Sequence, residues 1–207
     1  MTSEGVAGRR PVVVLDACVL VPPGLRDVLL SCADAGVFTP RWQSEIEDEV
    51  RRNGARYYAD RRGLPVVQAR EAVERVLSAM NEAFAAARLR PSEWVPVVPF
   101  MVNDARDRHV LAAAVGASAT HMLTLNRRHF PRATWPAGVV VKTPDDFLSA
   151  RLVDSQEPVL EAMRRMAARR RRPPESVAEL ARRMASEGSL SRFGGLLLRR
   201  VETVGGE

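Results

Sequence analysis

The sequence predicts an α/β fold with a mostly parallel central sheet, followed by a small helical appendage. Over residues 11–150, short apolar segments alternate with amphipathic ones, a pattern typical of strands connected by helices. The segment at 11–15 (PVVVL) is a continuous Val-rich run, as expected of a strand buried on both faces of a parallel sheet. Residues 151–207 instead contain amphipathic segments interrupted by Pro173 and Pro174, with 12 Arg against 8 acidic residues. We therefore expect a flexible tail at 1–10, a main domain at 11–150 and a basic helical extension at 151–207.

Local signals place the individual elements. The expected strands are 11–15, 37–39, 95–98, 121–125 and 139–142. The expected helices are 25–35, 41–52, 65–90, 107–116, 159–172 and 176–186, with a further apolar segment at 190–198. Gly36 marks the end of the first helix, and Asn53-Gly54 the end of the second. Thr143 and Pro144 predict another helix start, with Thr as N-cap and Pro at the first helical position.

The charge balance favours an anionic partner. The chain has 31 basic and 25 acidic residues, a net charge of +6, and Lys142 is its only Lys. Arg can contact phosphate through two N–H groups and stack on bases, which suits RNA, although a general composition bias would give the same numbers. The run Arg169–Arg172 is either a phosphate-contacting patch or a solvated helix end, where cations suit the helix dipole.

Composition excludes several classes of protein. With one Lys there is no Gly-x-x-x-x-Gly-Lys-Ser/Thr loop, and no Gly-x-Gly-x-x-Gly follows a strand. Cys18 and Cys32 are too few for a disulfide framework or a Cys-based zinc site. No apolar run is long enough to span a membrane, and the first residues do not resemble a secretory signal. These features predict a soluble cytoplasmic protein with no membrane partner.

Acidic residues stand at three informative places. Asp16 follows the first strand directly, Glu45 and Glu49 share one face of a helix, and Asp104 and Asp107 lie at the start of another helix. Each place has a simpler explanation, since Asp can cap a helix or turn and an acidic run can be a solvated face.

Taken together, the three places predict a metal site. In parallel sheets, ligands bind beyond the carboxyl ends of strands, where both Asp16 and Asn126 are expected. Two carboxylates 4 Å apart repel by about 4 kcal/mol at an effective dielectric of about 20, so several of them in one crevice need a cation. Oxygen ligands without a Cys or His cluster suit Mg²⁺ or Mn²⁺. Such an ion can activate water for attack on a phosphodiester.

Four segments in order resemble the PIN-domain ribonucleases, specifically VapC-like toxins of type II toxin–antitoxin systems. The segments are VVVLDACVL, SEIEDEV, NDARDRHVLAAA and TLNRRHF, and the resemblance covers about residues 11–150. It implies a three-layer α/β/α PIN-like fold and a Mg²⁺- or Mn²⁺-dependent endoribonuclease. It also implies structured RNA (tRNA or rRNA) as substrate, a cognate antitoxin and a homodimer. The extension after residue 150 resembles a helical C-terminal extension found on a larger subgroup of these toxins.

The resemblance also assigns roles to residues. Asp16 and Asp107 match acids that bind the metal directly, while Glu49, with Glu45 as the alternative, and Asp104 would complete the site or hold its waters. Asn126 stands where many members carry a fourth Asp, so it would orient a water or a phosphate oxygen without adding charge.

Two other interpretations of the sequence remain. In the first, the protein is a non-catalytic RNA- or protein-binding module, whose carboxylates are caps and ion-pair partners. In the second, Asp16 is the nucleophile of a phosphotransferase, but that chemistry usually needs a second Asp two residues later, where Cys18 stands. His109, His121 and His129 lack paired metal-ligand spacing and are expected to be structural, with a phosphate contact as the alternative for His129.

Overall fold

A four-stranded parallel sheet forms the centre of the protein, whose computed structural model describes residues 10–170, 174–186 and 188–204. The strands are β1 (Val12–Leu15), β2 (Thr39–Arg41), β3 (His121–Leu123) and β4 (Val140–Lys142). Their order is β2-β1-β3-β4, and each neighbouring pair is parallel. The predicted α/β class with a parallel sheet is therefore confirmed.

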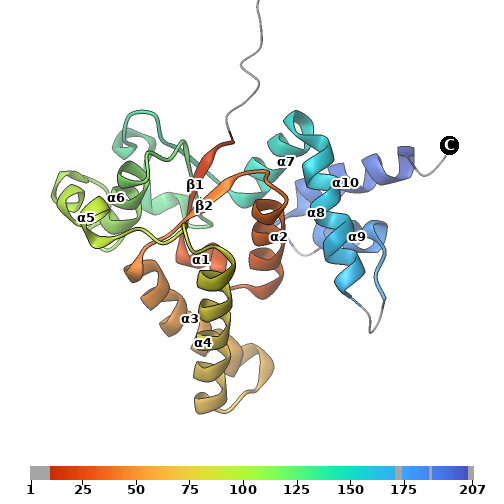
Figure 1. Ribbon diagram of the computed structural model, residues 1–207, viewed down its shortest axis with the longest axis horizontal. Helices are drawn as coiled ribbons and strands as arrows, with labels where there is room; N and C mark the ends of the chain where they lie inside the picture. Colours follow the sequence, from red (N-terminus) through yellow and green to blue (C-terminus); the bar gives the residue numbers. More distant parts are fainter. Residues whose placement is uncertain (1–9, 171–173, 187, 205–207) are drawn as a thin grey trace, which may run out of the picture.

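Helices surround the sheet and make a layered architecture consistent with a PIN-like three-layer fold. The helical elements are α1 (Ala17–Leu20), α2 (Pro23–Asp34), α3 (Ser44–Arg62), α4 (Val66–Ala83), α5 (Pro91–Trp94), η1 (Val95–Phe100), α6 (Arg108–Gly116), η2 (Arg127–His129), η3 (Arg132–Thr134), α7 (Pro144–Asp154), α8 (Gln156–Arg169), α9 (Val177–Ser186) and α10 (Ser191–Val204). Figure 1 shows α5 and α6 on one side of the sheet, and α2 with the C-terminal helices on the other. None of the described helices is long and apolar enough to cross a membrane.

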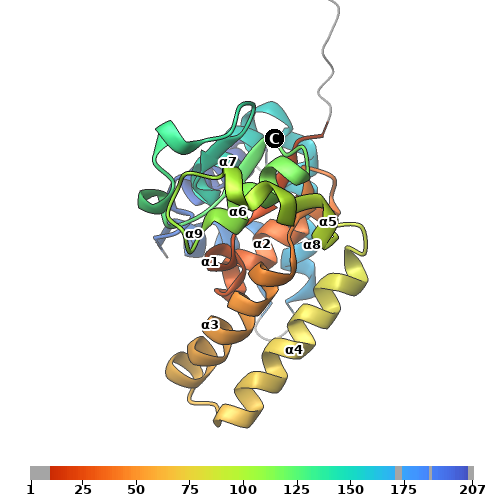
Figure 2. The same cartoon turned by 90° about the vertical axis from the view of Figure 1, so that its left-hand side faces the viewer.

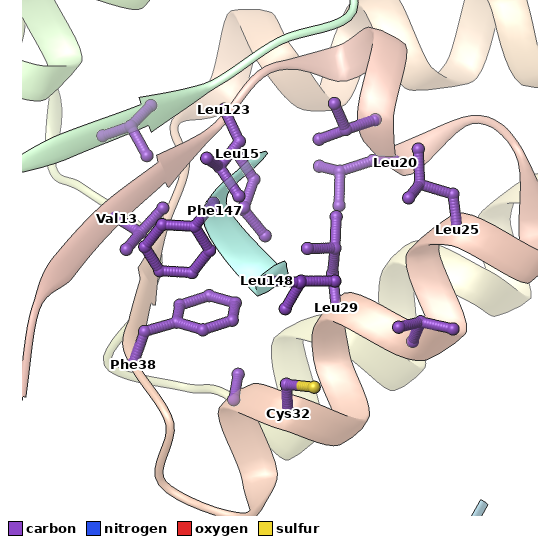
Figure 3. Close-up of a cluster of buried hydrophobic side chains, with 14 of the residues drawn as sticks. Val13, Leu15, Leu20, Leu25, Leu29, Cys32, Phe38, Leu123, Phe147 and Leu148 are labelled. Carbon is purple, nitrogen blue, oxygen red and sulfur yellow. The ribbon is translucent and has the colours of Figure 1, made fainter. Parts of the chain in front are cut away.

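The core explains the apolar run of the first strand. Val13, Val14 and Leu15 are all fully buried, and successive side chains of a strand point to opposite faces. Figure 3 shows Val13 and Leu15 facing side chains of α2 and α7. On that face, the rings of Phe38 and Phe147 meet edge to face at 5.4 Å. Helix α6 packs against β1 and β3 and is fully buried from Val110 to Ala114, so small residues bring it close to the sheet.

The strand predicted at 95–98 is wrong, because this segment forms the 3₁₀ helix η1. Pro96 and Pro99 supply no backbone N–H, so they cannot donate to a strand ladder, and η1 packs on α6 instead. The apolar residues of the segment had indicated a strand, but its prolines decide the local structure.

The predicted stop of the second helix at Asn53-Gly54 is also wrong, since α3 continues to Arg62. A Cβ on Gly54 would lie 2.9 Å from Val73 Cγ2, so this glycine allows α3 and α4 to pack closely rather than ending the helix. Figure 2 shows the two helices side by side, projecting from the rest of the molecule. The helix ends at Gly63, whose φ of 64° is the left-handed conformation that glycine adopts readily.

Other boundaries moved by smaller amounts. Strand β2 begins two residues later than its predicted start, α4 ends at Ala83 instead of continuing to residue 90, and β3 ends at Leu123, so Thr124 lies beyond it. The predicted cap at Thr143 is confirmed, because its side chain accepts a hydrogen bond from Asp146 N at 3.1 Å.

The C-terminal helices share the core of the main domain. Helix α7 runs across residue 150, where we expected the extension to begin, and it packs against α8 and α10. Both carboxylate oxygens of Asp145 accept bonds from the start of α10, from Arg192 N at 3.0 Å and Phe193 N at 2.7 Å. Met163 and Leu180 are buried in the same apolar cluster as the sheet. Of the expected tail and the Arg169–Arg172 run, residues 1–9, 171 and 172 lie outside the described residues.

Candidate active site

Asp16 and Thr124 lie side by side at the carboxyl edge of the sheet. Leu15 and Leu123 are partners in the β1–β3 pairing, so the residues that follow them are neighbours. Thr124 Oγ1 donates a hydrogen bond to Asp16 Oδ2 at 2.7 Å, and Asp16 is only 7% exposed. Asp16 stands at the N-cap position of α1, but its carboxylate accepts hydrogen bonds from the side chains of Thr124 and Cys18 and from no helix N–H. Capping therefore does not explain this buried carboxylate.

Cys18 completes the surroundings of Asp16. Its thiol donates to Asp16 Oδ2 at 3.1 Å, and its sulfur accepts from Leu125 N at 3.1 Å. Burial, and next the charge of Asp16, raise the pKa of the Cys18 thiol to about 12. The thiol is thus protonated at neutral pH and acts as a donor to the carboxylate, not as a nucleophile.

Glu49 brings helix α3 to the same edge. Burial, and next the charges of Asp16 and Asp107, together raise the pKa of Glu49 to about 7, while Arg52 opposes them. Carboxylates affect one another in this way only when they are close. We therefore infer that the carboxylates of Asp16, Glu49 and Asp107, which lie after β1, on α3 and before α6, are near one another, and we refer to them as the acidic cluster.

Asp107 and Asn126 are joined through a histidine. Asp107 Oδ2 lies 2.6 Å from His129 Nδ1, and Asn126 Nδ2 lies 2.8 Å from the same nitrogen. Asn126 N also donates to Thr124 Oγ1 at 2.9 Å, which connects this group to Asp16. Asp107 is at the N-cap position of α6, but its carboxylate bonds His129 instead. The segment after β3 thus links both ends of the cluster.

The remaining sequence candidates are placed differently. Glu45 lies one turn before Glu49 on α3, where its side chain accepts from Ser44 Oγ at 2.8 Å, and its charge opposes the burial that lowers the pKa of His109. Asp104 is exposed, and its Oδ1 accepts from Arg106 N at 3.0 Å within its own turn. Glu45 therefore stays near the cluster, whereas Asp104 shapes the loop before α6.

Glu47, in the same acidic run, has a structural role. It is 2% exposed, with Asn81 Nδ2 at 2.9 Å and Arg88 Nη2 at 3.2 Å from its carboxylate oxygens. These contacts fix α3 against α4 and the segment after it. One short run thus supplies Glu49 to the cluster and Glu47 to the packing of the helices.

Sequence reasoning missed Thr124, Cys18 and His109 as parts of the site. His109 Nε2 is buried, has no hydrogen-bond partner among the described residues, and lies 3.6 Å from Glu49 Oε1. Burial lowers the pKa of His109, while Asp16, Asp107 and Glu45 act in the opposite direction. Thr124 could have been found from its position directly after a strand, as Asp16 was. No feature of the sequence near His109 indicates that it contacts Glu49 of α3.

The donor chemistry of the cluster fits a hard divalent cation. It offers carboxylate oxygens from Asp16, Glu49 and Asp107; burial is the main cause of the raised pKa of Glu49, and the charges of Asp16 and Asp107, which a cation would offset, add to it. As the side chains lie, no three His, Cys, Asp or Glu residues of the described chain are arranged to hold a metal ion. In this arrangement one oxygen of Asp16 and one of Asp107 bond Thr124 and His129.

The fold and the site define an α/β protein with an acidic cluster at the carboxyl edge of a parallel sheet. Residues 144–198 match the family model of the VapC50 C-terminal domain. This match suggests a VapC-family protein. It covers about a quarter of the chain, from α7 into α10, and includes none of the strands. No curated protein and no solved structure matches the chain.

Proposed function

We propose that the protein is a metal-dependent endoribonuclease that cleaves structured RNA, and that it is the toxin of a toxin–antitoxin pair. The observation that carries this proposal is the cluster of Asp16, Glu49 and Asp107, in which burial, and next the charges of Asp16 and Asp107, raise the pKa of Glu49. The VapC50 C-terminal domain match supports the toxin assignment. The net charge of +6 favours a nucleic-acid substrate.

Asp16, Glu49 and Asp107 are the residues that would hold Mg²⁺ or Mn²⁺, with Glu45 as the alternative to Glu49 and Asp104 as a further candidate for holding its waters. When bound, the cation would polarise the phosphodiester and lower the pKa of a water. Thr124 and Cys18 fix the orientation of Asp16 through its Oδ2. His129 holds Asp107 in the same way. We propose that Asn126, whose side chain contacts His129 and Arg128, orients a water or a phosphate oxygen.

Substitution of single carboxylates tests this proposal. Asp16→Asn and Glu49→Gln should each reduce Mn²⁺-dependent RNA cleavage by at least about a hundredfold, because each removes a charge that would bind the cation. Asp48→Asn is the matched control, since Asp48 lies beside Glu49 on α3 but is exposed and pairs with Arg51. Glu45→Gln, compared with Glu49→Gln, shows which glutamate the reaction uses. Undiminished metal-dependent cleavage by Asp16→Asn would refute the proposal.

A non-catalytic RNA- or protein-binding module is the second candidate. It is favoured by the contacts of Asp16 with Thr124 and of Asp107 with His129, because each gives one carboxylate oxygen a hydrogen-bond partner without a cation. A melting curve with and without Mn²⁺ separates the two candidates, since a ligand that binds only the folded state raises the melting temperature. An unchanged melting temperature would favour the module. A rise that is lost in Asp16→Asn would favour the nuclease.

The proposed function includes a cytoplasmic location and two protein contacts. An antitoxin would cover the acidic cluster and could place an Arg or Lys among its carboxylates, a strong charge-assisted contact. We also propose a homodimer, which sedimentation of the purified chain would detect.

A further inference from the structure

A basic groove lies next to the acidic cluster. It has a volume of about 720 Å³ and is formed by η2, η3 and the edge strand β4. Its cationic lining residues are Arg127, Arg128, Arg132 and Lys142. The groove adjoins residues that flank the cluster, because Arg128 Nε donates to Asn126 Oδ1 at 3.1 Å and Thr124 N donates to Lys142 O at 3.1 Å.

The charges of this groove are available to a ligand. Arg127 and Arg132 are exposed, and within the described ranges neither of them nor Lys142 has an ion-pair partner. The acidic lining residue, Asp146, already lies 3.6 Å from Arg192 Nη1 of α10. The groove therefore presents a surplus of positive charge, because Arg192 of α10 neutralises Asp146.

An aromatic ring lines the same groove. Trp135 is half-buried, and its Nε1 donates to Phe130 O at 2.9 Å, which fixes the indole against its own loop. A fixed aromatic ring beside free guanidinium groups is typical of surfaces that bind single-stranded nucleic acid, where bases stack and cations follow the backbone.

We propose that this groove binds the sugar–phosphate backbone of the RNA and leads it to the acidic cluster, and that Arg192 of α10 assists by neutralising Asp146. The inference rests on the proposed function and extends it by naming the surface that holds the substrate. Arg127 and Arg132 contact phosphates, Lys142 adds a point charge, and Trp135 stacks on a base. Because Arg128 also bonds Asn126, it connects the bound backbone to the site of cleavage.

An acidic protein segment is the competing occupant of the groove. RNA is favoured because the cations lie beside Asn126, which flanks the proposed metal site, and because Trp135 offers a stacking surface that an acidic segment does not require. Guanidinium groups also match phosphate geometry through paired N–H donors.

The test is RNA binding by the full chain under conditions that prevent cleavage. Each protein carries Asp16→Asn and is titrated in EDTA with a labelled RNA stem-loop over a series of salt concentrations. The groove variant is Arg127→Gln with Arg132→Gln. The matched control is Arg61→Gln with Arg75→Gln, two exposed arginines on the α3–α4 projection. Both double variants remove the same charge, so a general loss of net charge affects them equally.

We expect the groove variant to bind RNA at least about tenfold more weakly than its parent. The slope of log binding constant against log salt concentration should become shallower by about 0.7 for each lost phosphate contact. The control should bind within about twofold of the parent, because its arginines are not expected to contact phosphates. Equal affinities for the groove variant and its parent would overturn the proposal and leave an acidic protein as the occupant. Equal weakening by both double variants would also overturn it.

A second pair of variants tests the contribution of α10. Arg192→Gln frees the charge of Asp146 in the groove and should weaken RNA binding, whereas Arg192→Gln combined with Asp146→Asn should restore most of it. An exposed ion pair contributes little stability, so these variants are expected to fold. Failure of the double variant to recover would refute the role of Arg192. These results differ from failure of the nuclease assignment, which would appear as a wild-type protein that binds RNA but does not cut it with Mn²⁺.

Discussion

Thr124 shows how one hydroxyl can organise the acidic cluster. It is fully buried, donates to Asp16 Oδ2 at 2.7 Å and accepts from Asn126 N at 2.9 Å. It thereby sets the position of the Asp16 carboxylate, which follows β1, and of the segment at Asn126, which follows β3.

Thr124→Val should therefore lower both stability and RNA cleavage. The substitution keeps the shape of the side chain but leaves buried polar partners unsatisfied, which costs about 1–3 kcal/mol. Urea unfolding measures the first effect, and cleavage rate at saturating Mn²⁺ the second. Thr124→Ser retains the hydroxyl and should stay close to the wild type in rate. If the Val and Ser variants were equally active, the hydroxyl would have no part in orienting Asp16.

Glu49 makes the stability of the metal-free protein depend on pH. Its pKa rises from 4.5 to about 7 on folding, so between these pH values the folded state binds more protons than the unfolded state. The contribution of Glu49 to stability must then fall as pH rises through this window, by at most about 3 kcal/mol. Glu49→Gln should remove this dependence and gain stability relative to the wild type above pH 7. Denaturant midpoints in EDTA across this pH range measure it, and parallel curves for the two proteins would contradict the prediction.

At the scale of the element, two adjacent glycines of α10 have different roles. A Cβ on Gly194 would lie 2.5 Å from Ala185 N and 2.8 Å from Ala181 O, so this glycine allows α9 and α10 to pack backbone against backbone. A Cβ on Gly195 would meet only Arg199 Nη1, at 3.8 Å.

Gly194→Ala should destabilise the protein. The added methyl group forces the backbone of α9 to move, and this cost should exceed the gain in helix propensity from replacing glycine. Gly195→Ala is the matched control and should be neutral or stabilising by up to about 1 kcal/mol. Thermal melting of both variants gives the comparison. Equal shifts in melting temperature would show that the backbones of α9 and α10 are not in close contact at Gly194.

The elements also show where local sequence signals fail. The apolar run before Asp16 and the cap at Thr143 were predictable, because a buried parallel strand and a Thr-Pro helix start each depend on adjacent residues. Gly54 and the segment at 95–98 were misinterpreted. The packing of Gly54 depends on Val73, which is distant in sequence, and an apolar segment that contains prolines can form a 3₁₀ helix against α6 instead of a strand.

At the scale of the whole molecule, the C-terminal helices and the sheet form one core. Phe193 of α10 is fully buried in the apolar cluster that also contains the side chains of β1. The domain that matches the VapC50 model is therefore packed as part of the α/β body, not only joined to it by a linker.

This continuity predicts a single unfolding transition. Phe193→Ala should lower the free energy of unfolding by about 3–5 kcal/mol, because it removes a fully buried aromatic side chain. Tryptophan fluorescence is the informative probe, because Trp42, Trp94 and Trp135 all precede the matched domain. The fluorescence midpoint should move together with the midpoint measured by far-UV circular dichroism. A fluorescence midpoint that stayed in place would show that the C-terminal helices unfold separately.

The sequence alone determined the fold class, the parallel sheet and the positions of Asp16, Glu49 and Asp107 on their strands and helices, because these depend on periodicity and on neighbouring residues. Only the tertiary structure indicates which acids lie near one another, since distances between β1, α3 and α6 depend on how these elements pack. For the same reason, Thr124 and His129 as partners of the carboxylates, Asp104 as a residue of its own turn, and the basic groove beside β4 became visible only in the folded chain.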